Sequence, residues 1–457
     1  MRKTAMSLDQ VIELINRLKL VEVLAHSQGT PNQGLVETVT HRQNLAELRV
    51  LLERLSPAEI ATILSRLALE DAGLIWPLVE AERGDDILWE LESAIGEQIA
   101  PGRIPKFHQG QVTLCAPYGD RLRVLEIHDR AGMEAVTPIW IDMLGLTSSE
   151  RGWIARRYGV DLPQPDDLTD LEVSTRFYVE DNGELHLHSN FLLDRDGDSR
   201  SVPVALIIHD NILFSVRNVD LPVFRLQRYR LRQQNAAATD ARAVLLALYG
   251  ADVEYSADLL EGSYAALRRI GKDVLSEHVT DSDAARLLAA IAKEEALNGR
   301  VRINLLDTQR AVSFLLRGRH ILDEDIIADA RDTLRDIESL ANHSSFLFDK
   351  INFLMDATVG FININQNRRV SQLTVAGVVF MPINVAAGVG GMSEFSMMTQ
   401  GIPWPLAYAG FIVGMILIGW LTYMTLKLGE RRQRSKILAA ERRRLSTRDP
   451  DPFPHRS

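Results

Sequence analysis

Cysteine is almost absent from this chain, since Cys115 is the only one among 457 residues. A single cysteine excludes an internal disulfide and any cysteine-rich zinc site, and it fits a reducing compartment. The chain also lacks an excess of positive charge, because 51 Lys and Arg residues face 61 Asp and Glu residues. The resulting net charge of −10 argues against nucleic acid as a partner. It is compatible with a large domain that interacts with cations.

Two other kinds of signal are missing. Residues 1–19 carry charges through their apolar positions, so they read as an amphipathic helix and lack the apolar core of a signal peptide. No phosphate-cradling glycine loop and no convincing nucleophile–base pair occurs in the sequence. We therefore predict no enzyme and no cofactor.

Charge itself is missing from two long stretches near the C-terminal end. Residues 370–393 and 395–426 contain no charged side chain, and Glu394 separates them. A helix needs about 20 apolar residues to cross about 30 Å of hydrocarbon. We therefore predict two transmembrane helices in a lipid bilayer, at about 370–392 and 404–427, with a short outer loop between them.

Basic residues flank these two spans on one side only. Arg368 and Arg369 precede the first span, and five Lys and Arg residues follow the second within Lys427–Lys436. The connecting loop at 390–403 contains neither Lys nor Arg. The positive-inside rule therefore places both termini, and the whole body before the first span, in the cytoplasm.

The predicted secondary structure changes along the part of the chain that precedes the first span. Ser56-Pro57-Ala58-Glu59 is a helix start with a capping box, and Thr147-Ser148-Ser149-Glu150 is another. Short apolar segments typical of strands surround the second one. The predicted divisions are a helical N-terminal domain at 1–104, an α/β cytoplasmic domain at 105–220, a helical cytoplasmic domain and stalk at 221–368, the two spans at 369–428 and a basic cytoplasmic tail at 429–457.

The stalk is predicted to be a single long helix. From Asp323 to Met392 the sequence has one proline, Pro382, and no glycine before Gly360. Such a helix would be about 105 Å long at about 1.5 Å per residue. The predicted fold class is an α+β membrane protein, in which a long stalk helix continues into two C-terminal transmembrane helices.

The stalk helix carries a small and polar stripe at heptad spacing, where an ordinary coiled coil would carry Leu, Ile and Val. Several copies around one axis would place its oxygen atoms in rings, which suits hard cations such as Mg²⁺. Two helices per chain cannot enclose a pore, so transport requires an oligomer. In the alternative interpretation, Asn and Gly only help helices to pack closely. The two rows are Asn342, Asp349, Asp356, Asn363, Val370, Gly377, Asn384 and Gly391, and Phe346, Phe353, Gly360, Asn367, Thr374, Met381 and Gly388.

The segment Val379–Ser393 resembles the end of the first membrane helix in the CorA family of Mg²⁺ channels. That family ends this helix in Phe-Met-Pro, followed by Gly and a Gly-Met-Asn motif. Trp140–Leu144, Glu150–Ile154 and Leu221–Leu226 are similar to segments of its cytoplasmic α/β domain. The resemblance covers about 106–436.

The resemblance implies a funnel-shaped homopentamer in a bacterial inner membrane, with five stalk helices around the pore. Asp356 then falls at a cytoplasmic acidic ring, Asn367 at a polar ring and Met381 at a hydrophobic gate. Asn384 falls where the family often has Thr. The implied pore-lining residues are Asp356, Gly360, Asn363, Asn367, Thr374, Gly377, Met381, Asn384 and Gly388.

The implied selectivity filter is Gly391, Met392, Ser393 and Glu394, with Ser393 in place of the family's Asn. A Ser hydroxyl is shorter than an Asn side chain and can also donate, so the ring would be wider. Mg²⁺ is the predicted ion. Zn²⁺ transport, as in the ZntB branch, is the alternative, and a non-conducting membrane sensor or scaffold is a third possibility.

Three acidic residues are candidate metal ligands. Asp349 and Asp356 come from the stripe, and Asp332 lies where the family carries a regulatory Mg²⁺ ligand between subunits. A solvated helix face is the other interpretation of Asp332. Residues 1–104 resemble, through Leu55–Leu64, the magnesium-responsive N-terminal domain of MgtE transporters, and a protein-docking helical array is the alternative.

Overall fold

The computed structural model of the chain describes residues 9–20, 33–108, 110–164, 166, 176–195, 198–233, 240–275, 280–318, 321–390, 401 and 403–446. The chain divides into two units. The first unit contains Met1–Arg269 and Ala292–Ile351, and the second contains Ile270–Ile291 and Asn352–Ser457. The unit boundaries lie within helices, so α11, α12 and α13 each contribute to both units.

The N-terminal part of the first unit is a helical array. The predicted capping box is confirmed, because the Glu59 amide donates to Ser56 Oγ at 3.3 Å and the Ser56 amide donates to Glu59 Oε2 at 2.9 Å. The helix over residues 9–20 contributes Val11, Ile15 and Leu18 to the apolar core of the array. The other helices are α2 (Gln33–Arg54), α3 (Pro57–Leu64), α4 (Leu69–Ile75), the 3-10 helix η1 (Trp76–Leu78), α5 (Ala81–Glu90) and α6 (Ser93–Ile99).

A seven-stranded mixed sheet follows, in the order β2-β1-β3-β7-β6-β5-β4. Only the β3–β7 pair is parallel, and every other neighbouring pair is antiparallel. Each strand coincides with one of the short apolar segments of the sequence. The strands are β1 (Gln111–Tyr118), β2 (Arg121–Ile127), β3 (Trp140–Leu144), β4 (Phe177–Val179), β5 (Leu185–Arg195), β6 (Asp198–His209) and β7 (Ile212–Arg217).

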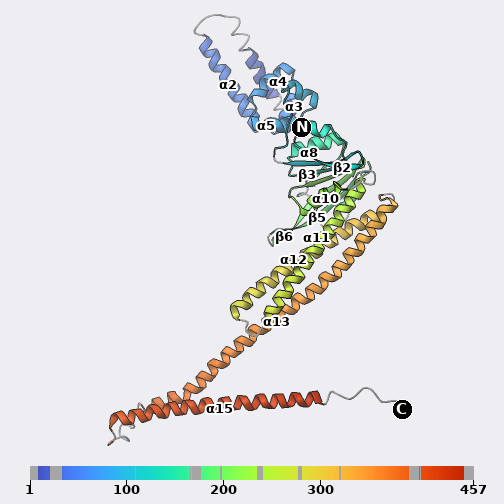
Figure 1. Cartoon of the computed structure of the whole chain (residues 1–457). Coiled ribbons are helices and arrows are strands. Elements are labelled where there is room, and N and C mark those ends of the chain that lie inside the picture. Colours follow the sequence, from blue (N-terminus) through green and yellow to red (C-terminus); the bar gives the residue numbers. More distant parts are fainter. Residues whose placement is uncertain are drawn as a thin grey trace, which may run out of the picture. The chain divides into compact units, whose positions relative to one another are not determined.

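Helices cover both faces of this sheet (Figure 1). Along β6 the side chains alternate between two cores: Ala205 and Ile207 join the core of α8 (Ser148–Tyr158), whereas Leu206 and Ile208 join the core of α10 (Pro222–Leu231) and α11 (Ala241–Val274). Burial on both faces explains why β6 reads as a continuous apolar run. A short helix, α7 (Arg130–Glu134), links β2 to β3.

The helical array is anchored to the sheet through Trp89, at the end of α5. Its side chain is fully buried in the core beneath α8, 4.7 Å from the ring of Phe107 and 5.2 Å from the ring of Trp153 between centroids. Arg130 lies 4.9 Å over the Trp153 ring and donates to the backbone oxygens of Leu88 in α5 and of Leu91 just after it. The array and the sheet therefore share a core.

Four long helices complete the chain: α11, α12 (Asp281–Arg317), α13 (Glu324–Gly390) and α15 (Trp404–Ser446). The 67 residues of α13 form one helix, about 100 Å long, as predicted from the scarcity of glycine and proline. Two helical stretches are long and apolar enough to cross a membrane, one within Glu324–Gly388 and the other at Trp404–Leu428. The second helix continues to Ser446, past the predicted end of its span.

Candidate ion pathway and the networks that support it

The long helix α13 has one covered face and one uncovered face. On the part of α13 that precedes the uncharged stretch, Ser344, Leu347, Ile351, Leu354 and Thr358 are buried, at alternating spacings of three and four residues. These positions form one stripe of a helix that turns about 100° per residue. This stripe is the side by which α13 packs onto the rest of the chain.

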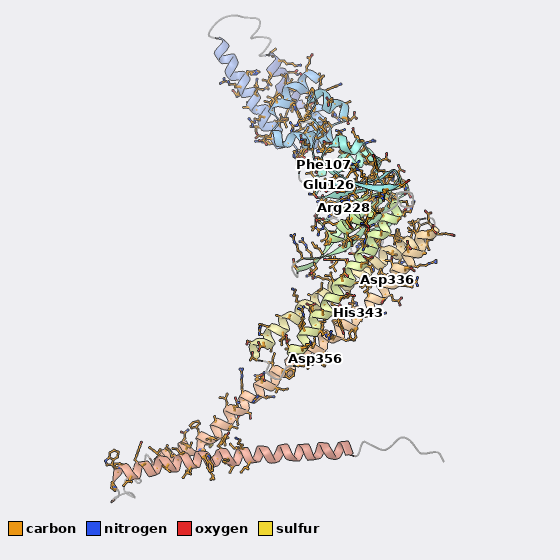
Figure 2. All side chains as sticks on the ribbon, viewed as in Figure 1. Phe107, Glu126, Arg228, Asp336, His343 and Asp356 are labelled. Atoms are coloured by element: carbon orange, nitrogen blue, oxygen red, sulfur yellow. The ribbon has the colours of Figure 1, made fainter. Side chains whose placement is uncertain are left out.

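The predicted polar stripe lies on the other side. Asp349 and Asp356 are exposed, and Phe353 between them is 60% exposed although it is apolar. Figure 2 shows Asp356 on α13. The chain therefore leaves this face available to another surface.

The membrane part of α13 is divided in the same way. Gly419 of α15 lies against Val379 and Ile383, so closely that a Cβ atom at position 419 would come within 2.8 Å of Ile383 Cδ1. Glycine at this position permits the two helices to approach closely. Met381 lies between these contact positions in the sequence and faces away from them, 69% exposed.

The remaining predicted pore residues can be placed on the same helix. Gly360 is half-buried, whereas Asn363, Asn367, Thr374, Gly377, Asn384 and Gly388 are exposed. Thr374 Oγ1 donates to the Val370 carbonyl oxygen at 2.8 Å, which leaves its lone pairs free to accept. The predicted filter, Gly391, Met392, Ser393 and Glu394, lies outside the described residues.

The candidate metal ligands do not form a metal site within one chain. In the described part of the chain, no three His, Cys, Asp or Glu residues are grouped so that they could hold a metal ion. Asp332 is exposed and paired with Arg335, one turn along α13. Asp349 and Asp356 could act together with further carboxylates only if other copies of the chain supplied them.

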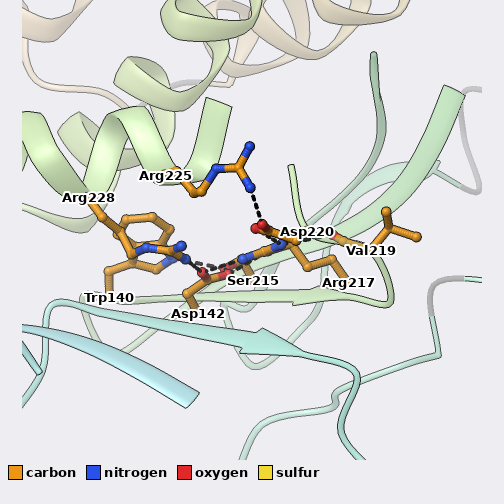
Figure 3. A network of polar contacts seen from close by, with 8 residues as sticks. All are labelled: Trp140, Asp142, Ser215, Arg217, Val219, Asp220, Arg225 and Arg228. Atoms are coloured by element: carbon orange, nitrogen blue, oxygen red, sulfur yellow. Dashed lines mark hydrogen bonds and ion pairs between the residues drawn. The ribbon is translucent and has the colours of Figure 1, made fainter. Parts of the chain in front are cut away.

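A buried ion-pair network attaches α10 to the sheet (Figure 3). Asp142 on β3 accepts from Arg217 Nε at 3.0 Å and from Arg217 Nη2 at 2.9 Å, and both side chains are at most 2% exposed. Ser215 Oγ donates to the same carboxylate at 2.9 Å, and Arg228 of α10 pairs with it. Sequence reasoning missed this network, because β3 and β7 are distant in the chain.

Burial alone would raise the pKa of the Asp142 carboxyl. Arg217 and Arg228, together with the hydrogen bonds from Arg217 and Ser215, more than offset that effect and hold the pKa below its ordinary value. Asp142 is therefore a carboxylate, and its charge is matched by guanidinium groups from β7 and α10. The network sets the position of α10, which leads into the long helices.

A second polar network joins the long helices to the sheet. Asp307 of α12 pairs with Arg176, with 2.6 Å between Oδ1 and Nη1, and accepts from the backbone amide of Asn190 at 2.8 Å. Nearby, Asp252 of α11 accepts from Asn304 Nδ2 at 2.7 Å and from Thr308 Oγ1 at 3.1 Å. No cation is paired with Asp252 among the described residues.

Burial raises the pKa of Asp252 to about 7, and its hydrogen bonds only partly oppose that shift. A carboxyl with a raised folded-state pKa stabilises the fold fully below its unfolded pKa of about 4, and this contribution is lost as pH rises through about 7. We therefore expect Asp252→Asn to remove a destabilisation of up to about 4 kcal/mol above neutral pH.

Thermal unfolding of the purified full-length protein at pH 5.5 and pH 8 checks this expectation. The midpoint temperature of the wild-type protein should be lower at pH 8 than at pH 5.5. The difference between the two pH values should be smaller for Asp252→Asn. The matched control is Asp258→Asn, which removes an exposed carboxylate from the same helix. The expectation is wrong if the wild-type and Asp252→Asn proteins show the same pH dependence.

Comparison with known families supplies independent information. A sequence model described as CorA-like Mg2+ transporter protein matches residues 137–428. The magnesium transport protein CorA of Escherichia coli K12 is 37% identical over 309 residues, which are 67% of this chain and 96% of that protein. The protein of the same name from Salmonella typhimurium is 36% identical over the same shares.

The fold has a counterpart among solved structures. The complete structure of the CorA magnesium transporter from Methanocaldococcus jannaschii matches 70% of this chain and 98% of that chain, with a TM-score of 0.52 and 13% sequence identity. At 13% sequence identity, this match shows a similar fold and does not assign a function.

Proposed function

Because the chain belongs to the family of CorA-like Mg²⁺ transporter proteins, we propose that it carries Mg²⁺ across a membrane along a water-filled path lined by α13. The observation that carries the proposal is the uncovered face of α13, on which Asp356, Asn367 and Met381 are all exposed. Carboxylate and amide oxygens suit a hard cation that keeps several of its waters. Small residues along the same face leave room for that hydrated ion.

The path requires several copies of the chain. One chain contributes a single α13, and one helix cannot enclose water. We propose a homopentamer, as the resemblance implies, in which the exposed faces of five α13 helices meet. Met381 then forms an apolar constriction, and Asn363 and Asn367 form polar rings on its cytoplasmic side.

The orientation follows from charge. Arg368 and Arg369 before the first span, and the basic residues from Lys427 onward, stay on the cytoplasmic side of a bacterial inner membrane. The Asp349 and Asp356 rings then face the cytoplasm, where they would concentrate divalent cations. Asp332 is the proposed regulatory ligand for Mg²⁺. Transport in this scheme needs no chemical step.

Ion flux in vesicles tests the proposal. The full-length protein is reconstituted into vesicles that contain a Mg²⁺-sensitive or a Zn²⁺-sensitive dye, and protein-free vesicles serve as the control. We expect Mg²⁺ entry well above the control, driven by its gradient. Entry of Zn²⁺ without Mg²⁺ would favour the zinc alternative, and an intact oligomer that passes neither ion would favour a sensor or scaffold.

A further inference from the structure

A groove of about 340 Å³ lies between α13 and α15 in the second unit. Its lining contains basic, polar and apolar side chains. The polar side chains are Arg368, Ser371 and Gln372 of α13, and Tyr423 and Lys427 of α15. None of the residues that line this groove belongs to the stripe that we propose for the ion path.

The groove carries positive charge without a matching carboxylate. Neither Arg368 nor Lys427 forms an ion pair among the described side chains, and no acidic residue lines the groove. In the sequence, Glu394 is the only acidic residue between Ala357 and Leu428. Two cations facing one groove repel each other, so an anion between them is strongly favoured.

Lys427 is held in position by an aromatic side chain. Its ammonium nitrogen lies 5.4 Å from the centroid of the Tyr423 ring and 3.5 Å from the Tyr423 hydroxyl oxygen. An ammonium placed over an aromatic ring is attracted by the ring's negative face. This contact orients a flexible side chain toward the groove and reduces the entropy that an incoming anion must remove.

The apolar residues of the lining are Val375 of α13 and Leu426 of α15. Both belong to the uncharged stretches that we assign to the membrane, whereas Arg368 and Lys427 mark the charged ends of those stretches. The groove therefore lies where the uncharged stretches end, with its two cations at headgroup depth and apolar side chains beside them.

We propose that this groove binds an anionic phospholipid, with the headgroup phosphate between Arg368 and Lys427. A guanidinium and an ammonium together neutralise a phosphate and donate hydrogen bonds to it. Ser371 and Gln372 supply further donors, and the acyl chain lies along Val375 and Leu426. A zwitterionic lipid carries its own cation beside the phosphate, so it gains less from these charges.

Native mass spectrometry of the detergent-purified full-length protein tests the proposal, with phosphatidylglycerol, phosphatidylcholine and inorganic phosphate as probes. We expect phosphatidylglycerol to stay bound where phosphatidylcholine does not. Arg368→Gln should weaken phosphatidylglycerol binding about fivefold, since one basic side chain near an anionic lipid contributes about 1 kcal/mol.

The matched control is Arg369→Gln, which removes the same charge from the neighbouring position, outside the groove lining. It should change binding less than twofold. Equal losses in the two variants would mean general attraction to the basic surface and would overturn the proposal. Equal binding of the two lipids, or displacement of lipid by millimolar phosphate, would also overturn it.

A second variant keeps the test valid if Arg368→Gln does not assemble. Leu426→Trp retains both cations and fills the apolar part of the groove, so it should also weaken phosphatidylglycerol binding about fivefold or more if the acyl chain lies there. Unchanged lipid binding in Leu426→Trp would contradict the assignment of the groove to a lipid.

Discussion

Replacing Asn367 with leucine should lower Mg²⁺ flux in reconstituted vesicles at least tenfold, or by about 1.4 kcal/mol or more in the barrier. On the proposed arrangement, position 367 is a polar ring on the cytoplasmic side of Met381. A ring of leucine side chains would make a second apolar constriction, which excludes water from a narrow path. Mg²⁺ loses its waters reluctantly, so a second dry segment in series with Met381 raises the barrier to its passage.

The chain offers a matched control for this substitution. Asn365 lies two residues away on the same helix, which places it about 200° around the helix axis from Asn367. Asn365→Leu therefore makes the same chemical change on the face opposite the stripe, and its flux should stay within about threefold of wild type. Equal flux in the Asn367→Leu and wild-type proteins would show that the stripe does not line the path.

The second large effect is expected on stability, from Arg217→Met. This change leaves the buried Asp142 carboxylate without the guanidinium that contacts both of its oxygens. Breaking a buried pair by removing one partner costs about 3–5 kcal/mol. Because Arg228 still reaches Asp142, we expect a loss near the lower end, about 3 kcal/mol, in urea-induced unfolding of the purified protein.

A double substitution separates charge from packing. Asp142→Leu combined with Arg217→Met removes both charges and keeps apolar volume, so it should recover most of the loss. Arg225→Met is the control, since Arg225 is exposed and its ion pair among the described side chains is with the half-exposed Asp220 at the edge of this network (Figure 3). A loss below about 1 kcal/mol in Arg217→Met would mean that the buried Asp142–Arg217 pair contributes no more than a surface ion pair.

Local patterns predicted most of the elements. The capping boxes at Ser56 and Thr147 are both present, because such a box involves only residues three apart in the chain. The strands were visible as short apolar segments, and the length of α13 followed from the scarcity of helix breakers. These signals depend on neighbouring residues, so they can be read without knowing the tertiary structure.

Contacts between distant residues were not visible in the sequence. Trp89 falls in the predicted helical domain, yet its side chain is in the core beneath the sheet. Asp142 and Arg217 are 75 residues apart, and a lone aspartate in an apolar strand gives no hint of its partner. The same holds for Asp252, because the packing of α11 against α12 and against β5 removes it from water.

For the candidate site, the division is equally clear. The sequence alone determined the heptad stripe of α13 and the two uncharged stretches, since periodicity and hydropathy are properties of the chain itself. Only the tertiary structure decided which face of α13 is covered, because a helix face becomes buried only where another element packs against it. Gly419 lets α15 approach one face at Val379 and Ile383, and that contact leaves Met381 and the rest of the polar stripe exposed.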